Sequence, residues 1–318
     1  MNSEITVVVM TYNQKEYISK AIDSILSQQF ATDYSILIHD DCSSDGTYEI
    51  LLDYQSKYPN KIQIIHQKTR KFLIDGFNMM IFKYVVPHIK TKYVAYCDGD
   101  DFWCDDYKLQ KQYDFMEKHK GYSMCFHSAY QLKNDGDMSS KWFISIEKDI
   151  DMSDLINDKP GICVATSSIF LKKESFIDFP EWRRNFPVED VPMYMMAAMH
   201  GKIHCLSDVM CVYRQFALGS WTSQNKNDLD KKIKHLSSIK EATICFNEWS
   251  QHKYNDLVVQ QIEGCDFRIG LLTNNFNVIF NKNYKRQFKR LPLKEQISLK
   301  LQYRLPCLYN LLHKKKKG

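Results

Sequence analysis

Residues 93–103 read YVAYCDGDDFW, an apolar run that ends in three carboxylates around one glycine. The apolar residues 93–97 are typical of a strand that is buried on both faces of a parallel sheet. Gly99 allows the chain to turn tightly where that strand ends. The stretch therefore predicts a strand tip that carries Asp98, Asp100 and Asp101 to the edge of a sheet.

These carboxylates repel one another unless a cation lies between them. Two carboxylates about 4 Å apart repel by about 4 kcal/mol at an effective dielectric constant of about 20. Mg2+ and Mn2+ prefer hard oxygen ligands of this kind and also bind phosphate oxygens. The cluster thus indicates a metal-bound phosphate or diphosphate. It is equally consistent with an acidic loop in which Asp105 or Asp106 caps the next helix.

Length and composition are those of a compact globular protein. The 318 residues are enough for one large domain or two ordinary ones, with 44% hydrophobic and 25% charged residues. The formal net charge of +5 is modest and is partly concentrated in residues 313–317, which read HKKKK. Nucleic acid is therefore not indicated as a partner.

The sequence predicts a cytoplasmic protein. It contains no apolar run of about 18 residues, and the strand-like residues 5–10 follow no basic region, so we expect neither a spanning helix nor a signal peptide. The ten cysteines are scattered singly without a C-x-x-C pair. Reduced, buried thiols are therefore favoured over disulfides or a zinc site.

Strands and helices alternate in the first 100 residues. We predict strands at 5–10, 35–39, 62–66 and 93–97, with amphipathic helices between them. This alternation predicts a parallel sheet with right-handed crossovers, in which ligands bind beyond the carboxyl ends of the strands. The polar residues just past the first three strands are Thr11, Tyr12, Asn13, Asp40, Asp41 and Arg70.

The same segments leave some alternatives open and exclude others. Residues 43–45 (SSD) can cap the helix that follows, whereas Asp40 and Asp41 are not needed as caps. Basic residues 68–71 can meet a phosphate or form a solvated loop. No G-x-G-x-x-G or P-loop follows the first strand, which argues against dinucleotide oxidoreductases and P-loop enzymes.

The alternation loosens after residue 104. We predict a helix at 109–116, a strand at 122–127, a substrate-facing or lid-like excursion at 132–150, a strand at 161–171 and a loop at 180–187. A helix begins near Asp190, and a further strand spans 209–213. From residue 225 onward the periodicity is helical, and the basic end either lies on an anionic membrane, packs on a partner or is a solvated appendage.

With these motifs in order, the chain resembles the family-2 glycosyltransferases, from about residue 5 to residue 222. Each motif is weak alone, but five in the family's order are specific. They are Thr11-Tyr12-Asn13, residues 40–47 (DDCSSDGT), residues 98–103 (DGDDFW), Glu189-Asp190, and Val212-Tyr213-Arg214 with Gly219-Ser220-Trp221. The segments around residues 99–112 look most like bacterial enzymes that build surface glycans.

The resemblance implies an α/β fold of the glycosyltransferase A (GT-A) type, a mostly parallel central sheet flanked by helices, with a C-terminal helical extension. Residues 1–224 would form the catalytic domain, with a nucleotide-binding half at 1–104 and an acceptor half at 105–224. Residues 225–318 would form the helical extension with its basic tail.

The resemblance also implies the roles of the candidate residues. Thr11, Tyr12 and Asp41 match the residues that hold the uracil and ribose of a UDP-sugar, with Asn13 and Asp40 beside them. The family's D-x-D motif matches Asp98-Gly99-Asp100, and Asp100 is expected to ligate Mn2+ or Mg2+, assisted by Asp98 and Asp101. The catalytic base matches Asp190 with Glu189 as its neighbour, and Arg70 and Arg214 are expected to face the diphosphate.

Two departures from the family pattern affect the expected site. Many relatives carry a histidine two residues after the Tyr-Arg pair, and here that position is Phe216. The Asn-x-Gly-type segment before the D-x-D strand is altered, with Gly76-Phe77-Asn78 as its nearest match. Without the resemblance, Asp190 reads as an acidic residue favoured at a helix N-terminus.

The sequence therefore predicts a metal-dependent, inverting glycosyltransferase, of hexosyl or N-acetylhexosaminyl type. It would move a sugar from UDP to a hydroxyl of a glycan or lipid-linked glycan in bacterial surface polysaccharide synthesis, in the cytoplasm or at the inner face of the cell membrane. The alternatives are a non-catalytic protein that binds a UDP-sugar or glycan, and a sugar nucleotidyltransferase, although the glycine-rich basic loop expected of the latter is missing.

Overall fold

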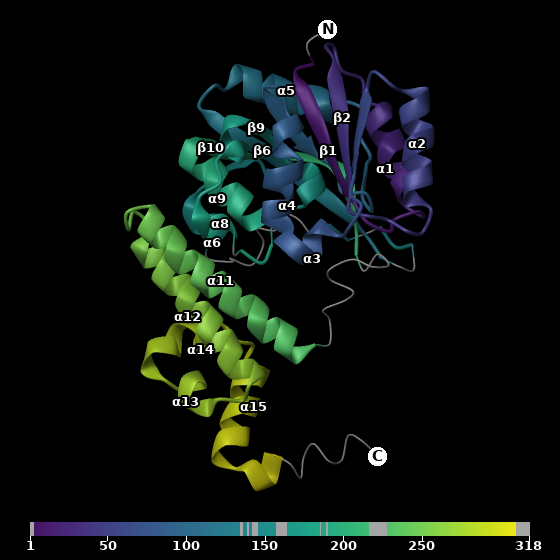
Figure 1. The fold of residues 1–318 in the computed structure, drawn as a ribbon. Coiled ribbons are helices and arrows are strands. Elements are labelled where there is room, and N and C mark those ends of the chain that lie inside the picture. The colour runs from purple at the N-terminus through teal and green to yellow at the C-terminus, as the bar shows by residue number, and fades with distance from the viewer. Residues whose placement is uncertain are drawn as a thin grey trace. The chain divides into compact units, whose positions relative to one another are not determined.

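A computed structural model describes residues 3–133, 136–138, 140–141, 146–156, 164–184, 186–188, 190–215 and 228–309 (Figure 1). The chain divides into two compact units, residues 1–227 and residues 228–318. Each unit is described by itself.

The first unit is built around one sheet. Within the described residues the strands follow the order β3-β2-β1-β4-β9-β6-β10-β5, with β7 paired to β6 and β8 paired to β10. The strands are β1 (Ile5–Thr11), β2 (Tyr34–Asp40), β3 (Ile62–His66), β4 (Tyr93–Tyr96), β5 (Phe102–Trp103), β6 (Tyr122–Leu132), β7 (Ser140–Lys141), β8 (Lys148–Ile150), β9 (Phe170–Lys172) and β10 (Lys202–Arg214).

The sheet is parallel across β3, β2, β1 and β4. The helices of this half are α1 (Ile18–Leu26), α2 (Thr47–Lys57), α3 (Lys71–Asp75) and α4 (Phe77–Tyr84), followed by the 3-10 turn Val86–His88. The expected alternation of strands and helices is confirmed. The register pairs Thr11 of β1 with Asp40 of β2, so the polar residues that follow both strands lie at the same edge.

The other half of the sheet is mixed. Strand β9 is antiparallel to β4 and β6, whereas β10 is parallel to β6 and antiparallel to β5 and β8. Its helices are α5 (Lys108–Lys118), α6 (Met152–Ile156), α7 (Glu174–Ile177), α8 (Glu181–Arg184) and α9 (Asp190–His200).

The prediction of a strand at 161–171 is confirmed only at Phe170 and Leu171, and it was wrong at residues 164–169. A 3-10 turn, Thr166–Ser168, precedes the short β9. The Ser168 hydroxyl donates to the Ala165 carbonyl at 2.6 Å, a local bond that competes with strand pairing. The predicted loop at 180–187 contains the short helix α8, and the strand predicted at 209–213 is the second half of the longer β10.

Both faces of the sheet are covered by apolar side chains. Along β1, Val7 and Val9 pack into a cluster with α1, whereas Val8 points into a second cluster with α4 and α9. Each residue of β1 is buried. This explains why β1 reads as a continuous apolar run rather than an alternating one.

The second unit is helical, as the sequence predicts. Its helices are α11 (Leu229–Trp249), α12 (Asn255–Leu272), α13 (Phe276–Ile279), the 3-10 turn Lys282–Tyr284, α14 (Lys285–Arg290) and α15 (Leu293–Arg304). The two long helices are linked by an ion pair between Lys240 and Asp266 at 2.7 Å. Among the described helices, none combines the length and apolar content that a bilayer span requires.

A buried histidine lies in the parallel half of the sheet. His39 of β2 is fully buried, and its Nε2 lies 3.1 Å from Nε2 of Gln67. Burial lowers the pKa of His39 to about 4. Because the unfolded chain would bind a proton at the ordinary pKa of about 6.5, the unfolded state takes up more protons in mild acid, and stability falls as the pH drops from 6.5 towards 4.

We expect His39→Gln to remove this contribution. The stability advantage of the wild-type protein over the variant should shrink by about 2 kcal/mol between pH 7.5 and pH 5. Urea unfolding followed by circular dichroism across this pH range measures the difference. His88→Gln, at an exposed position, is the matched control and should track the wild type. Parallel stability curves for His39→Gln and the wild type would contradict the prediction.

Candidate active site

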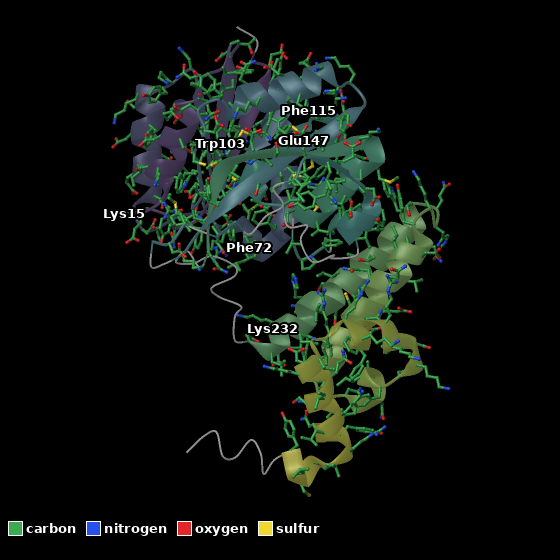
Figure 2. All side chains as sticks on the ribbon, turned by 180° about the vertical axis from the view of Figure 1, so that it is seen from behind. Lys15, Phe72, Trp103, Phe115, Glu147 and Lys232 are labelled. Carbon is green, nitrogen blue, oxygen red and sulfur yellow. The ribbon has the colours of Figure 1, made fainter. Side chains whose placement is uncertain are left out.

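The turns after β1, β2 and β4 meet at one edge of the sheet. The Asp41 amide donates to the Thr11 carbonyl at 3.0 Å, and the Gly99 amide donates to the Met10 carbonyl at 3.0 Å. Figure 2 shows Lys15, from the turn after β1, and Phe72, from α3 after β3, toward one end of the first unit, with Trp103 further inside. The structure therefore brings together the strand tips that the sequence singles out.

Gly99 lies where the turn after β1, residues 11–14, meets the turn after β4, residues 98–101. We call the latter the acidic turn. A methyl group added at Gly99 would lie 2.3 Å from Oε1 of Gln14 and 3.0 Å from Cβ of Thr11. The end of the Gln14 side chain could turn away from such a group, whereas Thr11 would have to shift by a few tenths of an ångström, so the contact with the β1 turn favours a small residue at this position. The two turns consequently form one packed unit.

Tyr12, Asp41 and Arg70 come together on one side of this edge. The Arg70 guanidinium lies 3.7 Å from the centroid of the Tyr12 ring, and its Nε is 3.8 Å from Oδ2 of Asp41. The Asp41 carboxylate accepts hydrogen bonds from the amides of Lys71 at 2.6 Å and Phe72 at 3.2 Å. Burial raises the pKa of Asp41, and these two amides oppose the shift.

The side-chain oxygens of Asn13 and Asp40 are hydrogen-bonded to other groups of the protein. The Asp40 carboxylate accepts from both the amide and the hydroxyl of Ser43, and its Oδ2 lies 2.7 Å from Nδ1 of His66. Asn13 has a left-handed backbone (φ 51°), and its Oδ1 accepts from the Ser44 amide at 2.8 Å. These contacts tie the β1 turn to the loop after β2.

The capping interpretation of residues 43–45 fits only the last of them. Asp45 accepts from the Thr47 amide at 3.0 Å, at the start of α2. Ser43 and Ser44 instead support the β1 turn, since the Ser43 hydroxyl accepts from the Asn13 amide at 2.8 Å and the Ser44 amide donates to Oδ1 of Asn13.

Four carboxylates gather at this edge, of which Asp101 is buried and Asp98, Asp100 and Asp190 are half-buried. Burial raises the pKa of Asp98, Asp100, Asp101 and Asp190. For Asp98 the negative charges of Asp100 and Asp190 add to burial and raise the pKa to about 8. Asp190 therefore lies close enough to the acidic turn to interact with it electrostatically. The positive charge of Arg214 favours the ionised form of Asp100.

Asp101 differs from its neighbours because both of its oxygens already accept protein hydrogen bonds. Oδ1 accepts from the Arg214 amide at 3.0 Å, and Oδ2 accepts from the Ser167 hydroxyl at 2.7 Å. The Ser167 hydroxyl in turn accepts from the Asp98 amide at 3.0 Å. Asp101 thus joins the acidic turn to β10 and to the 3-10 turn Thr166–Ser168.

The remaining donor set fits a divalent cation that is only partly ligated by protein. Asp98 and Asp100 are half-buried carboxylates that repel one another, an arrangement that a cation stabilises. In the part of the chain that the structure describes, no three His, Cys, Asp or Glu side chains are grouped to hold a metal ion by themselves. Two carboxylates, with phosphate and water as the other ligands, match the preferences of Mg2+ and Mn2+.

Arg214 is placed to meet an anion. Its guanidinium lies over the rings of Tyr17 and Phe102, with centroid distances of 5.1 and 5.3 Å. Its Nε is buried and has no hydrogen-bond partner in the described residues. A buried guanidinium N–H without a partner is suited to a phosphate oxygen.

Several site residues were missed by the sequence reasoning. The Thr166 hydroxyl contacts Asp98, and the Gln14 side chain contacts Asp100. The available signal was the polar run TSS at 166–168, which interrupts an apolar segment. Gln14 carries no signal beyond its position after the first strand.

Asn78 secures the segment that leads to Asp190. Its Nδ2 donates to the carbonyls of Phe186 and Val188, at 3.0 Å each, and the residue is 1% exposed. Asp190 then begins α9, and the Tyr194 side chain one turn later contacts its carboxylate. The predicted residues Glu189 and Phe216, and the motif at 219–221, lie outside the described residues.

Residues 6–178 match the family model described as glycosyl transferase family 2. The chain belongs to this family. An uncharacterized protein of Mycobacterium tuberculosis is 30% identical over 219 residues, covering 69% of this chain and 60% of that protein. The chain therefore spans about 60% of the length of the mycobacterial relatives it matches. The putative teichuronic acid biosynthesis glycosyltransferase TuaG of Bacillus subtilis is 26% identical over 255 residues, 78% of this chain and 95% of TuaG.

Solved structures confirm the expected GT-A fold. Staphylococcus aureus TarS, residues 1–349, superposes with a TM-score of 0.59 at 16% identity, covering 94% of this chain and 80% of that chain. The same TarS fragment has been solved in complex with UDP-GlcNAc. The mannosyltransferase PcManGT of Pyrobaculum calidifontis, in complex with GDP-Man and Mn2+, has a TM-score of 0.52 at 14% identity, covering 90% and 83%.

We expect Asn78→Ala to loosen the segment around Asp190. The substitution leaves two carbonyls without their donor, which should cost about 2 to 3 kcal/mol of unfolding free energy. Hydrogen exchange measured by mass spectrometry should rise at residues 186–195. Asn60→Ala, at an exposed position, is the control. Unchanged exchange at 186–195 in Asn78→Ala would show that the amide does not secure this segment.

Proposed function

We propose that the protein is an inverting, metal-dependent glycosyltransferase that uses a UDP-sugar. The observation that carries the proposal is the convergence of Asp98, Asp100 and Asp190 at the same sheet edge as Tyr12 and Asp41. This edge has the parts that the reaction needs: a place for a nucleotide, a place for a cation and a base.

The nucleotide is assigned to the side of Tyr12, Asp41 and Arg70. An aromatic ring, a carboxylate and a guanidinium in contact suit a base, a ribose hydroxyl and a phosphate, respectively. Uridine is the preferred nucleoside because the similar TarS structures contain UDP or UDP-GlcNAc. Asn13 and Asp40 are assigned a supporting role, since their side-chain oxygens accept hydrogen bonds from the loop after β2.

The metal is assigned to Asp98 and Asp100. When bound, Mn2+ or Mg2+ would neutralise the charge that grows on the departing diphosphate. The Mn2+ in the PcManGT structure supports this assignment. Arg214 offers a second positive charge to the diphosphate through its unpaired Nε. Asp101, expected from the sequence to assist the metal, instead orients the acidic turn and β10 through its two hydrogen bonds.

Asp190 is proposed as the base. Inversion requires a group that takes the proton from the acceptor hydroxyl as this hydroxyl attacks the anomeric carbon. Burial raises the pKa of Asp190, which makes its carboxylate a stronger base. Asn78 holds the segment that precedes Asp190, and the Tyr194 side chain contacts the Asp190 carboxylate, so both help to position the base. Glu189 stays a neighbouring candidate from the sequence.

The acceptor is proposed to be a bacterial surface glycan or its lipid-linked precursor, reached from the cytoplasm or the inner face of the membrane. TuaG is named for teichuronic acid biosynthesis, and a poly(ribitol-phosphate) beta-glucosyltransferase of Bacillus spizizenii is 26% identical over 181 residues, 56% of this chain and 27% of that protein. The second name supports a hexosyl donor, and the UDP-GlcNAc in a TarS structure supports an N-acetylhexosaminyl donor.

A donor screen tests the proposal directly. Purified protein is incubated with Mn2+ and one of UDP-Glc, UDP-Gal, UDP-GlcNAc, UDP-GalNAc or GDP-Man, and UDP or GDP release is read by mass spectrometry. We expect slow hydrolysis of one UDP-sugar. Tight binding of a UDP-sugar with no release would favour a non-catalytic binding protein. Pyrophosphate release from UTP and a sugar phosphate would favour a nucleotidyltransferase.

Two substitutions separate the base from the metal site. Asp190→Asn should lower turnover of the identified donor by about a thousandfold and leave Mn2+-dependent UDP affinity within about twofold. Asp100→Asn should weaken Mn2+-dependent UDP binding, measured by calorimetry. Asp114→Asn, at an exposed position, is the control. Full turnover in Asp190→Asn would remove this residue as the base.

A further inference from the structure

The end of the second unit exposes an unusual number of apolar side chains. Leu293 is 70% exposed, Ile297 56%, Leu305 53% and Leu308 44%. They belong to α15 and to the residues that follow it, at the yellow end of the ribbon in Figure 1. No residue of α15 is buried. We call α14, α15 and residues 305–308 the terminal surface.

One side of α15 holds it to its own unit. The Tyr303 ring lies 5.4 Å from the ring of Phe276 and 4.9 Å from that of Phe280. Gln296 donates from Nε2 to the Leu291 carbonyl at 2.8 Å. These contacts fix the orientation of the helix without covering its apolar residues.

The exposed side combines apolar and basic residues. At about 100° per residue, Leu293, Ile297 and Leu301 fall within about 80° of one another on the helix. Arg304 falls between Leu293 and Ile297 in this projection, and Lys300 and Lys294 flank the three apolar residues on either side. Lys294, Lys300 and Arg304 are all exposed.

The charge of this part of the chain is strongly one-sided. Residues 267–318 contain 13 Lys and Arg but a single acidic residue, Glu295. Residues 228–318 carry a formal charge of +10, so residues 1–227 carry −5 of the total of +5. The exposed cations of α14 are Lys285, Arg286, Lys289 and Arg290.

This combination decides between the kinds of partner. A second copy of the same surface would bring these cations together and be repelled. A nucleic acid would neutralise the cations but leave Leu293 and Ile297 in water. An anionic bilayer does both, since apolar side chains enter the boundary between headgroups and acyl chains while Lys and Arg contact lipid phosphates.

We propose that the terminal surface docks the protein on an anionic phospholipid membrane. The apolar side chains of α15 insert at the headgroup level, and the cations of α14 and α15 bind the lipid phosphates. The docking is peripheral and reversible, and it does not require the transferase activity, so its test is independent of the proposed function.

Vesicle sedimentation of the full chain tests the proposal. Vesicles of phosphatidylcholine alone are compared with vesicles containing 30% phosphatidylglycerol, at 0.1 M and 0.5 M NaCl. We expect binding to the anionic vesicles only, weaker by about tenfold at the higher salt because the ionic contribution is screened.

Two sets of substitutions separate the apolar and the ionic contributions. Leu293→Ser with Ile297→Ser, and Lys294→Ala with Lys300→Ala and Arg304→Ala, should each lower partitioning by about tenfold. Val259→Ser, at an exposed apolar position on α12, is the matched control and should bind within about twofold of the wild type. Circular dichroism checks that each variant keeps its helices.

Three outcomes would overturn the proposal. The first is equal binding to both kinds of vesicle. The second is full binding by both variants that is lost only when residues 314–317 are replaced by serine, which would place the contact in the lysine tail alone. The third is a concentration-dependent dimer, seen by light scattering, that the Leu293→Ser and Ile297→Ser substitutions abolish, which would assign the surface to a second copy.

Discussion

Crowding of partly desolvated carboxylates at one sheet edge is the constraint on which the site depends. Burial and mutual repulsion disfavour the ionised forms of Asp98, Asp100 and Asp101 together. The protein relieves only part of this by itself, because the Arg214 amide and the Ser167 hydroxyl satisfy Asp101. The negative charges of Asp98 and Asp100 are not fully compensated by the described protein groups around them. A bound cation would compensate these charges, which is why the acidic turn is the proposed metal site.

Both halves of the sheet are needed to hold that arrangement. The parallel half supplies the acidic turn, and the mixed half supplies Ser167 and the end of β10. A buried lysine reinforces the junction, since Nζ of Lys108 donates to Oε1 of Gln112 at 2.7 Å, and Nε2 of Gln112 donates to the Ser168 carbonyl at 2.9 Å. Burial lowers the pKa of Lys108 to about 8. Lys108 and Gln112, which follow the acidic turn in the chain, therefore hold the 3-10 turn Thr166–Ser168 beside it.

The sequence predicted the parts of the structure that have a local or periodic signal. Apolar runs located β1 to β4, and because parallel strands end at a common edge, Tyr12, Asp41 and Arg70 come together as the strand order implies. The site's supports were not predictable in this way. Ser167 and Asn78 act through contacts 66 and 108 residues away in the chain, and a single polar residue carries no sign of such a partner. Asp190 itself was recognised through the family resemblance, since its local pattern is that of a helix start.

The contact of Gly99 with Gln14 and Thr11 has a consequence for how such enzymes diversify. The Gly99 amide donates to the Met10 carbonyl, and Thr11 and Gln14 pack against Gly99, so a backbone shift in the turn after β1 is passed on to the acidic turn. A library that remodels the backbone at residues 11–14 to accept a different nucleotide would displace the acidic turn as well. Under the proposed function, exchanges of side chains such as Tyr12 and Arg70 would change the nucleotide contacts and leave the paired turns in place.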